Sequence, residues 1–236
     1  MKNLLILGLM ITALVIAQFA QAQTADEVID KYVNALGGKE KLAAVKSVSM
    51  QSVGDFNGNA VTTVFTKVQD KLYRSDVDFG SGTNMTLVTP EKAWRTDFRT
   101  QAISEVPADG LPKMLYMMDC INPMFNYAAK GHKVELVGKD TVDNVSCTKI
   151  KLTTKGGTEI LYWINNQTYL LQQQSVKANF GGREFEIVTG YSDYKAVDGV
   201  MFPFTSTLKG GRMGGPSALE KIELNKPVDE KLYKPQ

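Results

Sequence analysis

The feature that most constrains the fold of this chain is the segment 158–204, TEILYWINNQTYLLQQQSVKANFGGREFEIVTGYSDYKAVDGVMFPF. Residues that tolerate a left-handed backbone interrupt its β-branched and aromatic runs at 165–166, 179–182 and 198–199. This pattern predicts four consecutive strands joined by tight turns. The chain must therefore build an antiparallel meander, and other elements must cover the apolar face of that meander.

Residues 183–194 alternate between two faces of the predicted strand. Phe185, Ile187, Thr189 and Tyr191 share one face, and acidic or small residues occupy the other. One face of the sheet should therefore be apolar and the other exposed to water. The preceding strand, around 161–164, is apolar on both sides, so we expect it to be covered twice.

The rest of the chain repeats this strand pattern. Six short strands are expected between residues 47 and 106, two more within 133–154, and the last ones within 202–224. The fold class that follows is mainly β, with about 11–13 strands in antiparallel order. The tail from Pro227 is polar and is expected to be loose.

The N-terminus carries the three parts of a secretory signal peptide. Lys2 precedes an apolar run at 4–17, and the small-x-small sequence Ala20-Gln21-Ala22 follows. The apolar run is only about 14 residues, whereas spanning a bilayer takes about 20, so export is favoured over a membrane anchor. We expect residues 1–22 to be removed near Ala22, and residues 23–236 to form a single domain.

Helical signals flank the strands. Thr24-Ala25-Asp26-Glu27 has the form of a capping box and opens an amphipathic helix that Gly37-Gly38 ends, with a second short helix expected at 39–45.

An insert at residues 107–132 interrupts the strands and carries four of the ten methionines. Its Leu111, Met114, Leu115 and Met118 recur at helical spacing. It is either a core-facing plug or a surface that accepts variable apolar partners.

The two cysteines, Cys120 and Cys147, admit three interpretations. A disulfide is favoured because an exported chain meets an oxidising compartment. A reactive thiol has little support without a CxxC motif, and a buried, reduced pair stays open.

Motifs for catalysis, metal binding and nucleic-acid binding are missing from the sequence. A single histidine, His132, excludes HExxH, and there is no GxSxG and no P-loop. The carboxylate pairs Asp76/Asp78 and Glu184/Glu186 are typical of a solvated strand face. The 27 basic and 25 acidic residues nearly balance, which gives no reason to expect a nucleic acid as partner. We expect no catalytic residue, no metal and no cofactor.

Three stretches and the order of the elements carry a family resemblance. TADEVIDKYVNALGGKEKLAAVKSVSM, YWINNQTYLL and YSDYKAVDGVMFPF resemble exported, Bacteroidetes-type members of the LolA/LolB-like superfamily of periplasmic lipoprotein-sorting proteins. The resemblance implies a single highly curved antiparallel sheet, an incomplete barrel, with an N-terminal helix and an inserted lid helix. It also implies a location in the periplasm.

The resemblance further implies an apolar cavity for lipoprotein acyl chains or other lipids. The residues assigned to this cavity and its lid are Leu111, Met114, Leu115, Met118, Phe185, Ile187 and Tyr191. The protein would act as a monomer, with an inner-membrane releasing complex or an outer-membrane acceptor as partner. Two other functions stay open: an envelope scaffold or lipid-sensing module that binds a protein, and an enzyme acting on a lipid-like substrate.

Overall fold

The computed structural model describes residues 23–56, 58–180, 183–210 and 214–236, so the predicted signal peptide lies outside the described residues. It contains two α-helices, α2 (Ala25–Ala35) and α3 (Lys39–Ala44), and three short 3-10 helices, η1 (Leu111–Lys113), η2 (Leu115–Met118) and η3 (Glu230–Tyr233). The strands are β1 (Ser47–Phe56), β2 (Asn59–Val68), β3 (Leu72–Asp78), β4 (Thr83–Val88), β5 (Ala93–Thr96), β6 (Ile103–Glu105), β7 (Lys133–Val142), β8 (Val145–Thr153), β9 (Glu159–Asn165), β10 (Leu171–Phe180), β11 (Arg183–Val197), β12 (Val200–Lys209) and β13 (Gly215–Leu224).

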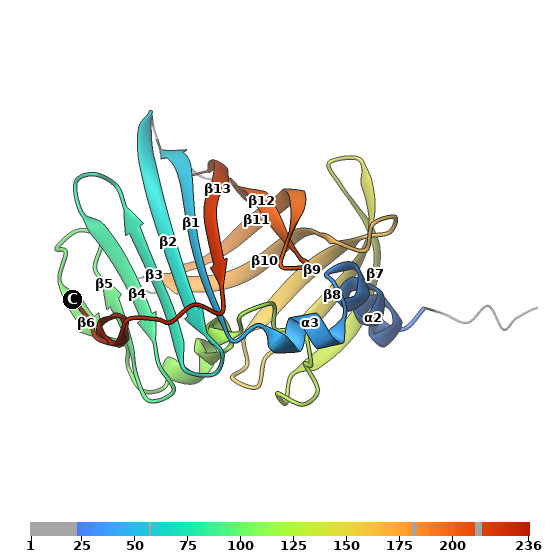
Figure 1. Cartoon of the computed structure of the whole chain (residues 1–236), viewed down its shortest axis with the longest axis horizontal. Coiled ribbons are helices and arrows are strands. Elements are labelled where there is room, and N and C mark those ends of the chain that lie inside the picture. Colours follow the sequence, from blue (N-terminus) through green and yellow to red (C-terminus); the bar gives the residue numbers. More distant parts are fainter. Residues whose placement is uncertain (1–22, 57, 181–182, 211–213) are drawn as a thin grey trace, which may run out of the picture.

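All thirteen strands belong to one antiparallel sheet, in the order β6-β5-β4-β3-β2-β1-β13-β12-β11-β10-β9-β8-β7. The first and last strands pair at its centre, and two meanders run outward from them. The edge strands β6 and β7 do not pair, so the sheet curves without closing, and the insert is the chain that connects its two edges (Figure 1). The predicted fold class, an incomplete antiparallel barrel of 11–13 strands, is confirmed.

Helix α2 begins as its sequence predicts. The Glu27 amide donates to the Thr24 hydroxyl at 3.2 Å, and the Thr24 amide donates to the Glu27 carboxylate at 3.2 Å. At the other end of the helix the Met201 amide of β12 donates to the Leu36 carbonyl at 2.9 Å. The buried stripe of the helix is Val28, Ile29, Tyr32 and Val33. In the described part of the chain, no helix is long and apolar enough to cross a bilayer.

The concave face of the sheet holds two apolar clusters. The first packs α2 and α3 against β7–β10, β12 and the centre of the sheet, around fully buried Leu42, Met124, Ile150 and Tyr162. The second packs η1 and η2 against β3–β5. The helices α2 and α3, together with residues 120–127 of the insert, therefore cover one half of the concave face, and η1 and η2 of the same insert cover the other half.

The convex face buries side chains as well. Tyr162 and Ile164 of β9 point into the first concave cluster, and Trp163 packs on the opposite face with Val142 and Cys147. The prediction that this strand is covered twice is confirmed. Its outer cover is made by neighbouring strands, with the Lys149 ammonium 4.6 Å from the centre of the Trp163 ring.

The predicted disulfide is wrong. Cys120 lies in the first concave cluster, whereas Cys147 lies in the convex cluster around Trp163, and both are buried free thiols. The alternation of β8 directs Cys147 away from the concave face, so the two sulfur atoms lie on opposite sides of the sheet.

The prediction of a loose tail is also wrong. Val228, Leu232 and Tyr233 cover an apolar patch on the convex face of β3–β5 that includes Leu72 and Leu87. In Figure 1 the tail crosses the outer side of the strands. Polar residues dominate the tail, and three apolar ones suffice to dock it.

Arg74 fixes this tail to the sheet. Its nearly buried guanidinium pairs with Asp76, with Nε 2.7 Å and Nη2 3.0 Å from the carboxylate. Its Nη1 donates to the carbonyls of Leu232 and Lys234 at 3.4 and 3.0 Å. One side chain therefore satisfies both a carboxylate and the tail backbone.

We expect Arg74→Gln to lower the free energy of unfolding by about 2–3 kcal/mol, because it leaves a partly buried carboxylate unpaired and frees the tail. Urea titration measures this, and proteolysis of the tail should accelerate. The control Lys92→Gln breaks a pair whose side chains are about half exposed and should cost less than about 1 kcal/mol. Equal losses for the two variants would contradict the assigned role of Arg74.

Candidate functional site

The insert forms two 3-10 turns where the sequence predicted a lid helix. Amides of Met114 and Met117 donate to carbonyls three residues earlier, at 2.9 Å each. Pro112 removes a donor in the first turn, and the helical stretch is too short to stabilise an α-helix by itself. The predicted segment therefore exists at the predicted place, with a tighter winding than expected.

The four residues that the sequence assigned to a lid lie together in one apolar cluster. Met114 and Met118 are buried against Tyr73 of β3, Val88 of β4 and Ala93 of β5. Leu111 and Leu115 pack at the edge of the same cluster, half-buried. The insert thus covers the concave face of the β2–β5 half.

The three predicted strand residues do not join that cluster. Tyr191 packs against the first concave cluster, and Ile187, half-buried, lies opposite Val176 at the same face. Phe185 is 49% exposed near the free end of β11. The face alternation was predicted correctly, yet the concave face is long, and only part of it lies beneath the insert.

The sequence did not identify the strand residues that contact the insert, which are Tyr73, Val88 and Ala93. The alternation of Tyr73 with Leu72, and of Val88 with Leu87, is visible in the sequence. Both faces of these strands are apolar here, because the tail covers the convex one. The pattern therefore could not show which residue faces the insert.

The insert also contacts the opposite half of the sheet. The Thr158 hydroxyl donates to the Lys113 carbonyl at 2.8 Å, in the turn between β8 and β9. In the same turn Gly156 lies so close to Pro112 that an added Cβ would be 1.8 Å from the proline carbonyl oxygen. Only glycine lets the insert approach the turn this closely.

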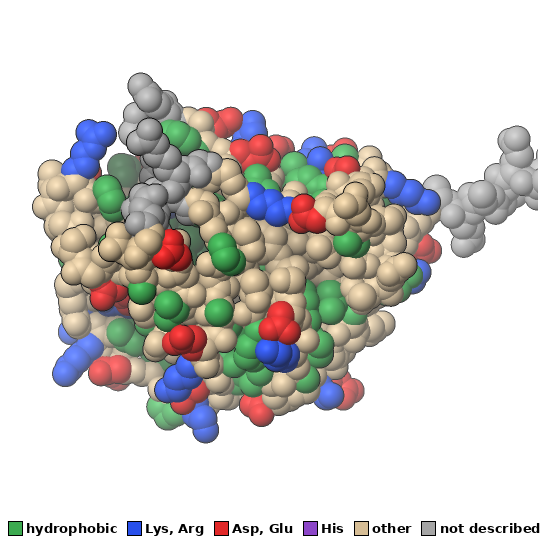
Figure 2. Space-filling view, turned by 90° about the horizontal axis from the view of Figure 1, so that it is seen from above, with side chains coloured by type: hydrophobic (Ala, Val, Ile, Leu, Met, Phe, Trp, Pro, Cys, Tyr) green, Lys and Arg blue, Asp and Glu red, His purple; other side chains and the backbone are tan. Residues whose placement is uncertain are grey.

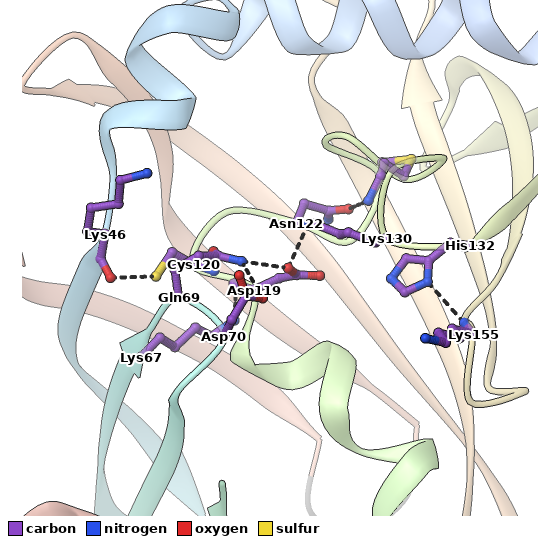
Figure 3. Close-up of polar contacts among 11 residues, drawn as sticks. Lys46, Lys67, Gln69, Asp70, Asp119, Cys120, Asn122, Lys130, His132 and Lys155 are labelled. Atoms are coloured by element: carbon purple, nitrogen blue, oxygen red, sulfur yellow. Dashed lines mark hydrogen bonds and ion pairs between the residues drawn. The ribbon is translucent and has the colours of Figure 1, made fainter. Parts of the chain in front are cut away.

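A buried polar network holds the end of the insert (Figure 3). Asp119 is 4% exposed, and its carboxylate lies 2.6 Å from Lys130 Nζ and accepts from Gln69 Nε2 at 3.1 Å. Lys67 Nζ donates to the Asp119 carbonyl at 2.9 Å, and the Cys120 amide donates to Gln69 Oε1 at 3.0 Å. The network ties the insert to the turn between β2 and β3.

His132 directly precedes β7 and binds the turn between β8 and β9. Its Nδ1 accepts from the Lys155 amide at 3.0 Å, while Nε2 is buried without a partner among the described residues. Burial lowers the pKa of His132 below its usual 6.5, Asp119 opposes that shift, and Lys130 adds to it. The imidazole is therefore held neutral as a hydrogen-bond acceptor.

These groups lack the electrostatics of a nucleophilic site. Burial raises the pKa of the Cys120 thiol to about 11, although Lys67 opposes the shift, so the thiolate is disfavoured at neutral pH. Burial likewise lowers the pKa of Lys67. The arrangement is better suited to holding the insert in place than to catalysis.

Three of the four carboxylates in the pairs Asp76/Asp78 and Glu184/Glu186 bind other side chains. Asp76 binds Arg74, Glu184 binds Lys177 at 2.9 Å, and Glu186 accepts from the Ser175 hydroxyl at 2.7 Å. Within the residues that the structure describes, no three potential metal ligands lie together. Basic and acidic side chains are interspersed on the face seen in Figure 2, so this face offers no field of a single sign.

Comparison with known proteins gives a fold and no sequence family. No family model matches the chain, and no curated protein matches its sequence. A LolA superfamily protein from Nitrosomonas europaea matches with a TM-score of 0.56 and 12% identity, covering 90% of this chain and 99% of that one. A DUF1329 family protein from Desulfovibrio piger matches at 0.53 and 11%, covering 90% and 98%.

A third solved structure, described as an outer membrane lipoprotein-sorting protein domain from Vibrio parahaemolyticus, matches with a TM-score of 0.52 and 8% identity. It covers 88% of this chain and 94% of its own. The chain therefore has a LolA-like fold, as the resemblance predicted. At these identities the likeness concerns the fold alone.

The lowered pKa of His132 predicts in which direction the folding stability changes with pH. The unfolded chain binds this proton more readily than the folded chain, so stability should fall as the pH drops below about 6.5. His132 is the only histidine in the sequence, and carboxylates titrate at lower pH, so urea titrations between pH 7 and 5 isolate it. In His132→Asn, which keeps an acceptor for the Lys155 amide, this pH dependence should disappear. An unchanged slope would refute the assignment.

Proposed function

We propose that this protein binds and carries lipoprotein acyl chains or other lipids on the concave face of its sheet, beneath the insert, in the periplasm. The observation that carries the proposal is the insert itself. Four adaptable apolar side chains, Leu111, Met114, Leu115 and Met118, cover an apolar strand surface through two short turns. The likeness to LolA superfamily and lipoprotein-sorting structures supports it.

Binding would work by exchange of one apolar partner for another. In the free protein the insert occupies the surface of Tyr73, Val88 and Ala93. An acyl chain that enters displaces Met114 and Met118 from this surface, so the insert competes with the lipid and lowers its net affinity. That competition makes release to an acceptor possible, with no bond made or broken.

The proposal includes a monomer loaded by an inner-membrane complex and emptied by an outer-membrane acceptor, in aid of lipoprotein sorting. An envelope scaffold or lipid-sensing module that binds a protein partner is the second candidate. The first concave cluster favours this second candidate, because the protein's own side chains, including Met124 and Tyr162, occupy the region between α2 and the sheet.

Native mass spectrometry of the full chain purified from its own periplasm, followed by lipid extraction, tests the carrier proposal. We expect one acylated species per chain. The delipidated protein should also bind a fluorescent fatty acid in competition with other lipids. A protein that is empty as isolated and binds no fluorescent fatty acid would overturn the carrier proposal and favour the scaffold.

A single methyl group can test whether the insert is the lid. Gly156→Ala places a Cβ where the Pro112 carbonyl lies, so the insert must move away from the β8–β9 turn. We expect this variant to lose stability and to bind the fluorescent fatty acid about three- to tenfold more tightly, because the closed state is disfavoured.

Gly157→Ala is the matched control. Gly157 has a positive φ of 86° and no atom near its added Cβ, so the substitution strains the backbone without touching the insert. It should lose stability with no gain in affinity. A gain in both variants, or in neither, would show that movement of the insert does not control access.

A further inference from the structure

Seven tyrosines belong to the first concave cluster, and five of them come from helices and strands. Tyr32 comes from α2, Tyr116 from η2, Tyr162 from β9, and Tyr191 and Tyr194 from β11. Their rings belong to the cluster that packs α2 and part of the insert against the strands. Their hydroxyls bring polar groups into a region where the other side chains are mainly aliphatic.

The hydrogen bonds of these hydroxyls are unequal. Tyr194 donates to the Leu171 carbonyl at 2.8 Å. The hydroxyls of Tyr32 and Tyr162 have no partner among the described residues, although the two residues are only 3% and 1% exposed. Each hydroxyl oxygen nevertheless keeps a small solvent-accessible surface, so a water-sized group can reach it. A hydroxyl that water can reach and that no protein group binds is available to donate to a ligand that displaces the water.

The surroundings specify the charge of that acceptor. Burial raises the pKa of Tyr32 and of Tyr162, so both hydroxyls stay protonated and can donate. Neighbouring tyrosines act in the same direction on both groups, and the Asp119 carboxylate does so on Tyr162. A second anion in this place would meet repulsion and desolvation, whereas an uncharged oxygen would meet neither.

We propose that the hydroxyls of Tyr32 and Tyr162 donate hydrogen bonds to an uncharged ester carbonyl of the bound lipid, and so select acyl esters over free fatty acids. The inference rests on the proposed function and names its ligand class. Tyr116 belongs to the insert, so displacement of the insert opens a path to this cluster. The ester comes either from the diacylglyceryl group of a lipoprotein or from a free glycerolipid.

The test compares three ligands that each have one 18-carbon chain with one double bond: methyl oleate, oleate and 1-octadecene. Each displaces a fluorescent fatty acid from the delipidated full chain. We expect methyl oleate to bind about 25-fold more tightly than 1-octadecene, with oleate no tighter than the hydrocarbon. Each neutral hydrogen bond then accounts for about fivefold, or about 1 kcal/mol. In Tyr32→Phe/Tyr162→Phe the preference should vanish, while affinity for 1-octadecene stays unchanged.

Tyr194→Phe is the matched control, because its hydroxyl already has a protein acceptor. It should lower the melting temperature and keep the ester preference. The double variant should melt at the same temperature as the wild type or higher, because it removes hydroxyls that lack partners. A melting temperature lowered as in the control would indicate a purely structural role and overturn the inference.

The outcomes separate this inference from the proposed function. If the wild type binds all three ligands without preferring the ester, or if the double variant loses 1-octadecene affinity in parallel, the ester site is wrong and the carrier function stands. If none of the ligands displaces the probe, the carrier function fails and the site fails with it. A diacylated lipopeptide that binds more tightly than dioleoylglycerol identifies the lipoprotein as the source, and the reverse order identifies a glycerolipid.

Discussion

The structure depends on one constraint: a strongly curved sheet that does not close leaves an apolar concave face that something must cover. The first and last strands, β1 and β13, pair at the centre of the sheet. The strands farthest from them in each meander, β6 and β7, therefore form the two edges. The chain must then pass from one edge, β6, to the other, β7, and the shortest such path runs across the open side. The insert therefore lies on the concave face because of connectivity, before its own sequence contributes anything. Its methionines and leucines adapt it to that position.

The two covers of the concave face differ in how firmly they are held. Helix α2 is capped at its start, buries four apolar residues and is bonded to β12. The insert has two turns of 3-10 helix and depends on the side-chain network of Asp119, Lys67, Gln69 and Lys130. Burying these charges costs solvation that their attraction only partly returns, so the network fixes the position of the insert more than it adds stability. Opening of the insert should thus require less free energy than release of α2.

Much of this fold could be read from the sequence, because strands and turns are local signals. The turn residues marked nearly every hairpin, and the capping box at Thr24 marked the first helix. What failed depended on contacts distant in sequence. The docking of Leu232 depends on Arg74, about 160 residues earlier, and the separation of Cys120 from Cys147 depends on which face of β8 turns inward. For the candidate site, the insert residues were predicted and their strand partners were not, since the tail makes both faces of β3 and β4 apolar.

The proposed binding of acyl chains raises a problem of release, which the insert would resolve. An acyl chain of 16 carbons gains about 0.8 kcal/mol for each buried methylene, or about 13 kcal/mol in total, which corresponds to nanomolar affinity or tighter. Reburial of Met114 and Met118 returns about 1.5–3 kcal/mol per side chain, an offset of about 3–6 kcal/mol. The difference leaves a net affinity in the range of a reversible carrier. Because both partners are apolar, this exchange sets how strongly a chain is held and cannot distinguish one lipid from another. Discrimination must come from a polar contact, and the unpartnered hydroxyls of Tyr32 and Tyr162 are placed to supply it.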